Sequence, residues 1–330
     1  MPRYLPDGSR NAIRVQRLKN KLGNRSNASS EVEFCDATGW LLGQAGRGIP
    51  TILEMGGYTR LDCVVGTASA SCAPRSPTLC ITRGRAAFGR KLADQPLMQN
   101  VLADLALESE AATAFALRLA RCFDQTGDPA QALLGRILTP TPSKYWLCKR
   151  GPGFGAEAME VMGGNGYVED GPLARLYREF PVNSIWEGSG NVMCLDLLRA
   201  FGKTPAARDA LAAELALAGR ANAAFNAYAD RLLADLAQPQ GDEYGALSAG
   251  RTDRGGGAGR AAAGPCSRRT WPTPLSLRAS PRTWAAPTDG CLAGVDCEAI
   301  LARFALIVTI FAKMRTNPAL AGIMADKSQQ

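Results

Sequence analysis

Helical periodicity over residues 97–123 constrains the fold of this chain more than any other feature. Apolar residues recur there at steps of three and four, which places them on one face of an α-helix. A second periodic stretch covers about residues 130–162, is made irregular by Pro140 and Pro142, and stops at Gly163 and Gly164. A further helix should follow residue 190, and residues 204–237 have a strong amphipathic pattern. The chain is therefore expected to be mostly α-helical.

The first 48 residues have a different character. Apolar and polar residues alternate through Val32 and Phe34, which is typical of a strand with one covered face. Turn-forming residues surround this stretch, and a helix is expected to begin near Pro50, because proline fits the first turn of a helix. We therefore expect a β-rich part at 1–48, a helical domain at 49–240, and an irregular, partly disordered tail at 241–330.

Residues 69–82 and about 250–290 interrupt the helical pattern with proline, glycine and arginine. One interpretation is loop or disorder. Another is a shifted reading frame. If both segments are written with GC-rich codons, a second reading frame of the same bases encodes sequences with a helical pattern. Seven arginines and one aspartate between residues 250 and 288 also account for +6 of the net charge of +8. The basic balance therefore belongs to one unusual segment.

Residue types that are missing exclude several kinds of chemistry. The chain has no histidine, and its ten cysteines contain no C-x-x-C pair, so we expect neither a metal site nor a histidine base. The longest apolar run near the C-terminus, residues 304–312, is too short to span a bilayer, and residues 1–11 lack the apolar core of a signal peptide. A cytoplasmic protein without membrane contact is expected.

Residues 181–193 contain the best candidate for chemistry, a lone carboxylate at Glu187 within the octapeptide SIWEGSGN. Glycines allow close backbone approach to a ligand, and a following helix N-terminus offers free N–H groups. A carboxylate beside Trp186 in a partly dry site would suit a general base for a weakly acidic C–H group. Taken alone, the octapeptide favours a simpler interpretation, a helix cap with a solvated glutamate.

A wider set of motifs resembles the acyl-CoA dehydrogenases. Residues 157–193 are similar to that family's GGxGY turn followed by its aromatic-Glu-Gly turn, and residues 85–106 to its R-x-x-F-G motif and L-A-D helix. Residues 21–49 resemble the last strands of its middle β-domain, and residues 59–62 the start of its C-terminal helical domain. The AidB-like, alkylation-response branch is the most similar.

The resemblance implies a C-terminal helical bundle preceded by a remnant of the middle β-domain. It implies that Glu187 is the base, that Arg60 lies near the substrate-binding helix, and that FAD is the cofactor. It also implies that Arg85 and Phe88 contact the flavin nucleotide of a neighbouring subunit. The remaining cofactor-binding residues implied by the family pattern are Gly163, Gly164, Ser184, Ile185, Trp186, Gly188, Ser189, Gly190 and Asn191.

Some departures from the family pattern bear on function. Glu160 stands where many relatives carry glutamine, and Pro96 stands where glutamine is usual. The chain is also expected to be N-terminally truncated, because it starts inside the middle β-domain. Three functions therefore remain open: FAD-dependent oxidation of an acyl-CoA thioester at its α,β bond, binding of double-stranded DNA as an alkylation-response protein, or an inactive fragment. A complete family member would be a homo-oligomer, commonly a tetramer.

Overall fold

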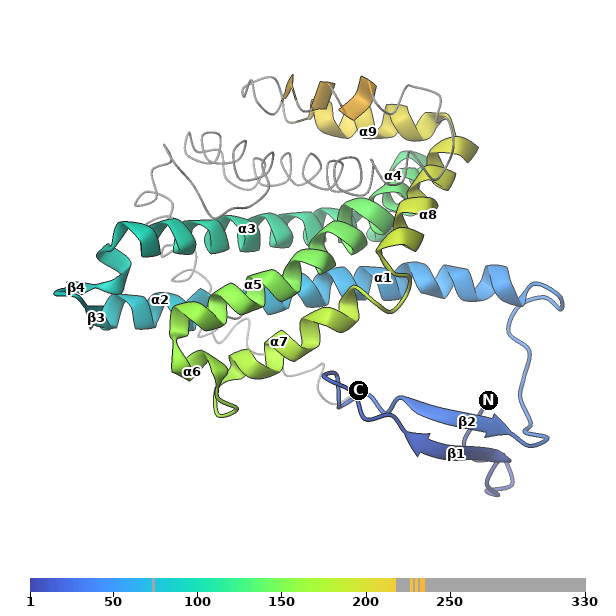
Figure 1. Ribbon diagram of the computed structural model, residues 1–330. Helices are drawn as coiled ribbons and strands as arrows, with labels where there is room; N and C mark the ends of the chain where they lie inside the picture. The colour runs from blue at the N-terminus through green and yellow to red at the C-terminus, as the bar shows by residue number, and fades with distance from the viewer. Residues whose placement is uncertain (73–74, 218–225, 228, 231, 235–330) are drawn as a thin grey trace, which may run out of the picture.

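The computed structural model describes residues 1–72, 75–217, 226–227, 229–230 and 232–234 (Figure 1). Its described part is mostly helical, as the periodicity predicts. In chain order the elements are β1 (Ile13–Leu18), β2 (Ser30–Phe34), α1 (Gly48–Cys72), α2 (Arg75–Gly84), β3 (Ala86–Ala87), β4 (Arg90–Lys91), η1 (Leu92–Asp94), α3 (Pro96–Asp124), α4 (Pro129–Leu138), η2 (Thr139–Tyr145), α5 (Trp146–Met162), α6 (Gly164–Tyr167), α7 (Pro172–Asn183), α8 (Gly190–Lys203) and α9 (Ala206–Ala216).

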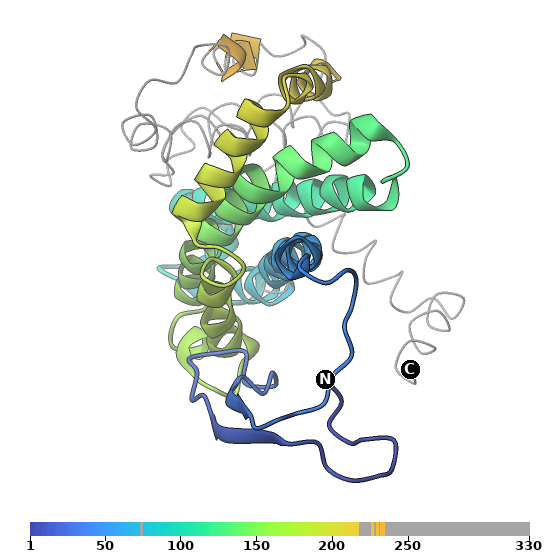
Figure 2. The same ribbon diagram turned by 90° about the vertical axis from the view of Figure 1, so that its right-hand side faces the viewer.

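The core lies where α1, α3 and α5 pack together and α4, α8 and α9 close one end. Phe115, Leu119 and Leu138 at its centre are completely buried, and Phe201 from α8 and Leu211 from α9 pack against the same cluster. In the view along α1 (Figure 2), the β1–β2 hairpin lies below the helical layers and α9 lies at the opposite side of the molecule. Among the described residues, no helix is both long enough and apolar enough to span a bilayer.

The irregular helix predicted for residues 130–162 is confirmed as three consecutive segments, α4, η2 and α5. The middle segment η2 is a π-helix, in which hydrogen bonds span five residues instead of four. Pro140 and Pro142 explain this widening, because proline has no N–H group and its ring collides with the carbonyl four residues earlier. The prolines therefore change the pitch of the helix without ending it.

The loop interpretation of residues 69–82 is wrong for the described residues, because α1 continues to Cys72 and α2 starts at Arg75. The shifted reading frame stays a prediction. The hydroxyls of Ser71 and Thr82 donate to carbonyls four residues earlier, at 2.9 and 2.8 Å, so these polar residues are satisfied within a helix. The twelve-residue helix α7 leads directly into the Glu187 turn. The basic segment at 250–290 lies outside the described residues.

The predicted strand through Val32 and Phe34 is confirmed as β2, which pairs with β1 in an antiparallel hairpin. Asn11 ties its base together, since its buried side-chain amide donates to the carbonyls of Pro2 and Thr38, both at 2.8 Å. The hairpin loop contacts the helical part through the backbone N–H of Asn24, which donates to Glu179 Oε1 of α7 at 2.6 Å. The hairpin is thus anchored to the helix that leads into the Glu187 turn.

Close packing of α5 against α7 depends on two glycines. Phe180 of α7 is completely buried, and a Cβ atom on Gly151 would lie 2.4 Å from its ring carbon Cδ1. A Cβ atom on Gly155, the second glycine, would lie 2.8 Å from Cε2 of the same ring. We expect Gly151→Ala to lower the free energy of unfolding by about 1–3 kcal/mol, because the ring has no space to move into. Denaturant unfolding would measure this. Gly153→Ala is the control: a Cβ there meets nothing within 4 Å, so no loss is expected. Equal losses in both variants would contradict this packing.

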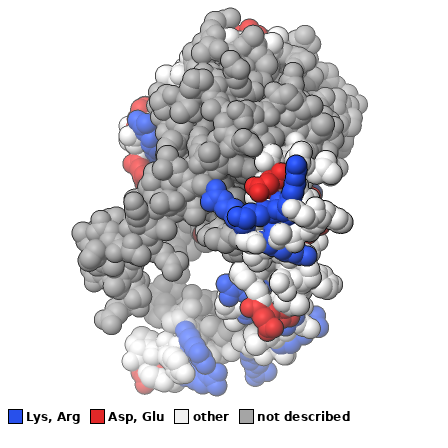
Figure 3. Space-filling view, turned by 90° about the vertical axis from the view of Figure 1, so that its left-hand side faces the viewer, with Lys and Arg blue, Asp and Glu red and all other residues white. Residues whose placement is uncertain are grey.

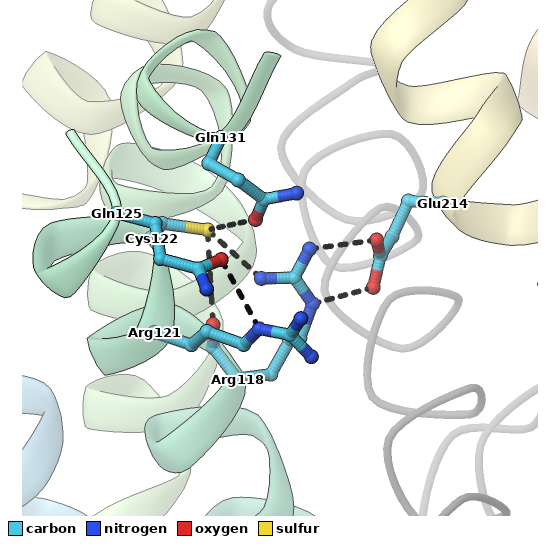
Figure 4. A network of polar contacts seen from close by, with 6 residues as sticks. All are labelled: Arg118, Arg121, Cys122, Gln125, Gln131 and Glu214. Carbon is cyan, nitrogen blue, oxygen red and sulfur yellow. Dashed lines mark hydrogen bonds and ion pairs between the residues drawn. The ribbon is translucent and has the colours of Figure 1, made fainter. Parts of the chain in front are cut away.

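A buried ion pair attaches α9 to the bundle (Figure 4). Arg118 of α3 donates to both carboxylate oxygens of Glu214 on α9, at 2.7 and 2.8 Å, and the two side chains are 9% and 7% exposed. The third guanidinium nitrogen lies 3.0 Å from the sulfur of Cys122. The hydrogen bond to Glu214 raises the pKa of Arg118, so this side chain stays charged. Each partner therefore requires the other.

Candidate active site at the turn between α7 and α8

Residues 184–189 form the turn that connects α7 to α8, and Glu187 lies at its bend. The backbone N–H groups of Ile185 and Trp186 fold back onto the carbonyl of Val182 at 2.9 and 3.0 Å. Glu187 and Gly188 then adopt φ angles of 60° and 110°. A non-glycine residue in the left-handed region is uncommon and must be held there by its surroundings. The expected turn is confirmed, although Pro181 and Asn183 belong to the end of α7.

Two cationic side chains hold the backbone of this bend. Arg60 of α1 donates from Nε to the carbonyl of Glu187 at 2.9 Å, and its Nη2 contacts Asp196 Oδ2 of α8 at 3.0 Å. Lys144 of η2 donates from Nζ to the carbonyl of Gly188 at 3.1 Å. The bend is therefore connected to α1, to the π-helix and, through Asp196, to α8.

Lys144 is only 1% exposed. Burial lowers the pKa of its ammonium, and the nearby carboxylate of Glu187 opposes this effect. Burial raises the pKa of Cys148 to about 12, so this thiol is neutral and unreactive. Thr67 connects the two cysteines, since its hydroxyl lies 2.8 Å from the carbonyl of Cys63 and 3.4 Å from the Cys148 sulfur.

The Glu187 carboxylate is directed toward α1. Its Oε2 lies 3.8 Å from the position that a Cβ atom on Gly56 would take, so a side chain there would approach it. Glu187 is half-buried, and its carboxylate accepts no hydrogen bond from any residue in the described ranges. A carboxylate with free lone pairs and a fixed backbone is able to accept a proton from a molecule placed beside it.

The other residues of the turn differ in their exposure. Ser184 and Trp186 are half-buried, whereas the side chains of Ile185, Ser189 and Asn191 are exposed. Gly188 and Gly190 are required as glycines: a Cβ on Gly188 would lie 2.4 Å from Met193 Cε, and one on Gly190 would lie 2.8 Å from the ring of Tyr145. The glycines therefore let the turn lie against η2 and the start of α8.

A cavity of about 620 Å³ lies beside Arg60 and Asp196, between the first half of α1, the α3–α4 connection and α8. Its walls include Leu53, Tyr58 and Phe123. Four basic and two acidic side chains also line it. The basic ones are Arg60, Arg136, Arg199 and Lys203, and the acidic ones are Glu54 and Asp196. The cavity thus combines apolar walls with an excess of positive charge, which suits an amphipathic anion.

Four further predicted site residues gather at the other end of α7. At the tip of the β3–β4 hairpin, Phe88 is 98% exposed with a φ of 54°. A Cβ on Gly163 would lie 3.1 Å from Nη1 of Arg85, and one on Gly164 would meet nothing within 4 Å. Basic side chains gather on this end of the molecule (Figure 3), where the exposed cations of the hairpin region are Arg83, Arg85, Arg90 and Lys91.

The predicted residues thus form two groups. The helix α7, which is about 18 Å long for its twelve residues, lies between them. Arg60 and the turn at Glu187 lie together, whereas Arg85, Phe88, Gly163 and Gly164 lie beyond the far end of α7 (Figure 1). Sequence reasoning missed Lys144 and Asp196, which hold the turn and Arg60. A lysine in a proline-interrupted helix was the available signal for Lys144.

Residues 46–202 match the model of the family described as "Acyl-CoA dehydrogenase, C-terminal domain". The chain is 56% identical over 211 residues to the putative acyl-CoA dehydrogenase AidB of Escherichia coli, which covers 64% of this chain and 39% of that protein. It therefore spans about two fifths of the length of this curated relative.

Solved structures with the same fold include Caenorhabditis elegans ACDH-11 in complex with C11-CoA. That structure has a TM-score of 0.69 and 24% identity, and the match covers 92% of this chain and 51% of that one. An acyl-CoA dehydrogenase from Bacillus anthracis, complexed with FAD, has a TM-score of 0.60 and 17% identity, with coverage of 97% and 62%. At these identities the likeness concerns the fold.

Proposed function

We propose that Glu187 is the general base of an acyl-CoA oxidation. Residues 46–202 match the C-terminal domain of the acyl-CoA dehydrogenase family, and the similarity to AidB supports the same assignment. In this reaction the Glu187 carboxylate takes a proton from C2 of an acyl-CoA thioester, and a hydride leaves C3. The products are a 2-enoyl-CoA and a protonated Glu187. Bound FAD supplies the acceptor for the hydride.

One observation carries this proposal: the only fixed carboxylate of the turn is free to accept a proton and lies next to a cationic cavity. Arg60 belongs to both, since it donates to the Glu187 carbonyl and lines the cavity of about 620 Å³. A thioester bound with its reacting carbon at Glu187 and its nucleotide in this cavity would use both features. Binding of the remote nucleotide would then position the weakly acidic C–H group.

The residues at the far end of α7 fit one end of a dinucleotide cofactor. Arg85 and the neighbouring hairpin cations suit a diphosphate, and Phe88 offers an exposed ring for stacking. Gly163, with a φ of 65° beside Arg85, leaves room for close approach of a ligand to the backbone. Because α7 separates this group from Glu187, we propose that it contacts FAD bound at the Glu187 site of another copy in a homo-oligomer.

The cavity explains how the coenzyme part of the substrate would be held. Coenzyme A carries a diphosphate and a ribose phosphate, and the cavity has two more cations than acids. Arg60 and Arg199 both contact Asp196, at 3.0 and 2.8 Å. Arg136 and Lys203 form no ion pair with any described residue, so they are available for phosphate oxygens.

We expect Arg136→Ala and Lys203→Ala each to weaken acyl-CoA binding about fivefold. An exposed ion pair contributes up to about 1 kcal/mol, and tenfold in affinity corresponds to about 1.4 kcal/mol. Calorimetric titration of the whole chain with octanoyl-CoA at low and high salt would measure this. The matched ligand is octanoyl-pantetheine, which lacks the nucleotide and should bind both variants as it binds the wild type. Equal losses for both ligands would contradict nucleotide binding in this cavity.

A further inference from the structure

We propose that the buried side chain of Lys144, together with Arg60, is a positioning device that holds Glu187 in its left-handed conformation. The two hydrogen bonds to the successive carbonyls of Glu187 and Gly188 are called the carbonyl clamp below. This inference rests on the proposed function only in naming Glu187 as the base. The clamp itself is a statement about the geometry of the turn.

The conformation of Glu187 needs such support. A φ of 60° at a residue with a Cβ atom costs roughly 1–2 kcal/mol relative to ordinary backbone. Glutamate has no side-chain feature that compensates for this cost, whereas Gly188 at 110° is unstrained. Strain of this kind persists only where neighbouring groups determine the backbone, and it concentrates at functional sites.

The carbonyl clamp acts on the peptide groups that follow each of the two residues. Fixing the carbonyl of Glu187 fixes the rotation about its Cα–C bond, and fixing the carbonyl of Gly188 does the same for the next residue. Arg60 supplies the first contact at 2.9 Å and Lys144 the second at 3.1 Å. With both rotations set, the direction in which the Glu187 side chain leaves the backbone is set as well.

Burial of the Lys144 ammonium lowers the stability of the fold, which argues against a purely structural role for this residue. An ammonium that is 1% exposed has lost its hydration, and burial lowers its pKa. An apolar side chain of similar length would avoid this penalty, as replacement of buried charges by apolar residues often does. The hydrogen bond from Lys144 to the carbonyl of Gly188 therefore explains why a charged residue stands at this position.

The π-helix places Lys144 where it can reach the turn. The segment η2 packs directly against α8, and the ring of Tyr145 fills the space that the missing side chain of Gly190 leaves open. Single π-helical turns within α-helices occur frequently at functional sites, because they shift the side chains that follow onto a new face. By widening the helix, Pro140 and Pro142 thus place Lys144 beneath the bend of the turn, and not on another face of the helix.

Lys144→Met in the whole chain tests the inference, with Lys19→Met at an exposed position as the matched control. Hydrogen–deuterium exchange of the amides of residues 187–190 should become at least about tenfold faster in Lys144→Met, while α3 stays protected and the melting temperature does not fall. Unchanged exchange in the turn would overturn the inference. General loss of protection would also overturn it, because it would show a structural role.

A second readout separates positioning from binding. Exchange of C2 hydrogens of octanoyl-CoA in deuterated water should slow by about tenfold or more in Lys144→Met, with the affinity for octanoyl-CoA unchanged. If the wild type exchanges no C2 hydrogen, the proposed function fails, and the amide exchange of the turn still decides the carbonyl clamp. Should Lys144→Met not fold, Arg60→Met carries the same amide measurement on the neighbouring carbonyl, because the Arg60 side chain is 21% exposed and its loss leaves a smaller buried gap.

Discussion

Glu187→Gln is expected to lower the rate of C2 hydrogen exchange of octanoyl-CoA by about 10³-fold or more, since general base catalysis contributes typically 10²–10⁴-fold. Glutamine has nearly the same shape as glutamate but cannot take the proton. The carbonyl clamp acts on the backbone, through Arg60 at 2.9 Å and Lys144 at 3.1 Å, so the substitution should leave the turn in place. Mass spectrometry of the thioester in deuterated water measures the exchange without any oxidant.

Two controls make this result specific. Glu160→Gln removes an exposed carboxylate of α5 and should leave the exchange rate unchanged. The affinity of Glu187→Gln for octanoyl-CoA should remain within a few fold of the wild type, because the cationic cavity is intact. If Glu187→Gln exchanges C2 hydrogens as fast as the wild type, another group is the base.

Glu214→Ala is expected to have the largest effect on stability, a loss of about 3–5 kcal/mol in the free energy of unfolding. The substitution leaves the guanidinium of Arg118 buried without its carboxylate partner, and a guanidinium does not give up its proton in a protein. Chemical denaturation followed by circular dichroism measures the loss. The change should appear in α9 first, since Glu214 is the polar attachment of that helix to α3 (Figure 4).

The control for this prediction is removal of both charges at once. Arg118→Met with Glu214→Leu leaves no buried unpaired group and should restore most of the stability. Glu31→Ala disrupts an ion pair with Arg17 whose side chains are 70% and 43% exposed, and it should change nothing measurable. A double variant as unstable as Glu214→Ala would show that the loss comes from packing and not from the unpaired charge.

Much of the fold follows from periodicity alone. The apolar spacing over residues 97–123 predicts α3, and the pattern over residues 130–162 predicts the α4–η2–α5 run, because burial of a single face repeats with the helix period. Periodicity did not predict the helices over residues 69–82. Hydroxyl groups such as those of Ser71 and Thr82 bond to their own helix backbone, so polar residues there do not end the helices.

The site was predictable only in part. Local sequence carries the turn, since the glycines at 188 and 190 are required by contacts with Met193 and Tyr145. The contacts of Lys144 and Asp196 and the cationic cavity were not predictable, because each depends on how distant helices meet. The separation between the Glu187 turn and the Arg85 group likewise arises from the helix α7 that lies between them.

Anaerobic titration of the whole chain, supplied with FAD, with octanoyl-CoA tests the central claim most directly. The account predicts that the visible absorbance of the flavin bleaches as one equivalent of 2-enoyl-CoA forms, and that Glu187→Gln binds FAD without bleaching. Bleaching that is equal in the wild type and in Glu187→Gln would contradict the role of Glu187. A wild-type chain that takes up FAD and octanoyl-CoA with no bleaching would contradict the proposed oxidation itself.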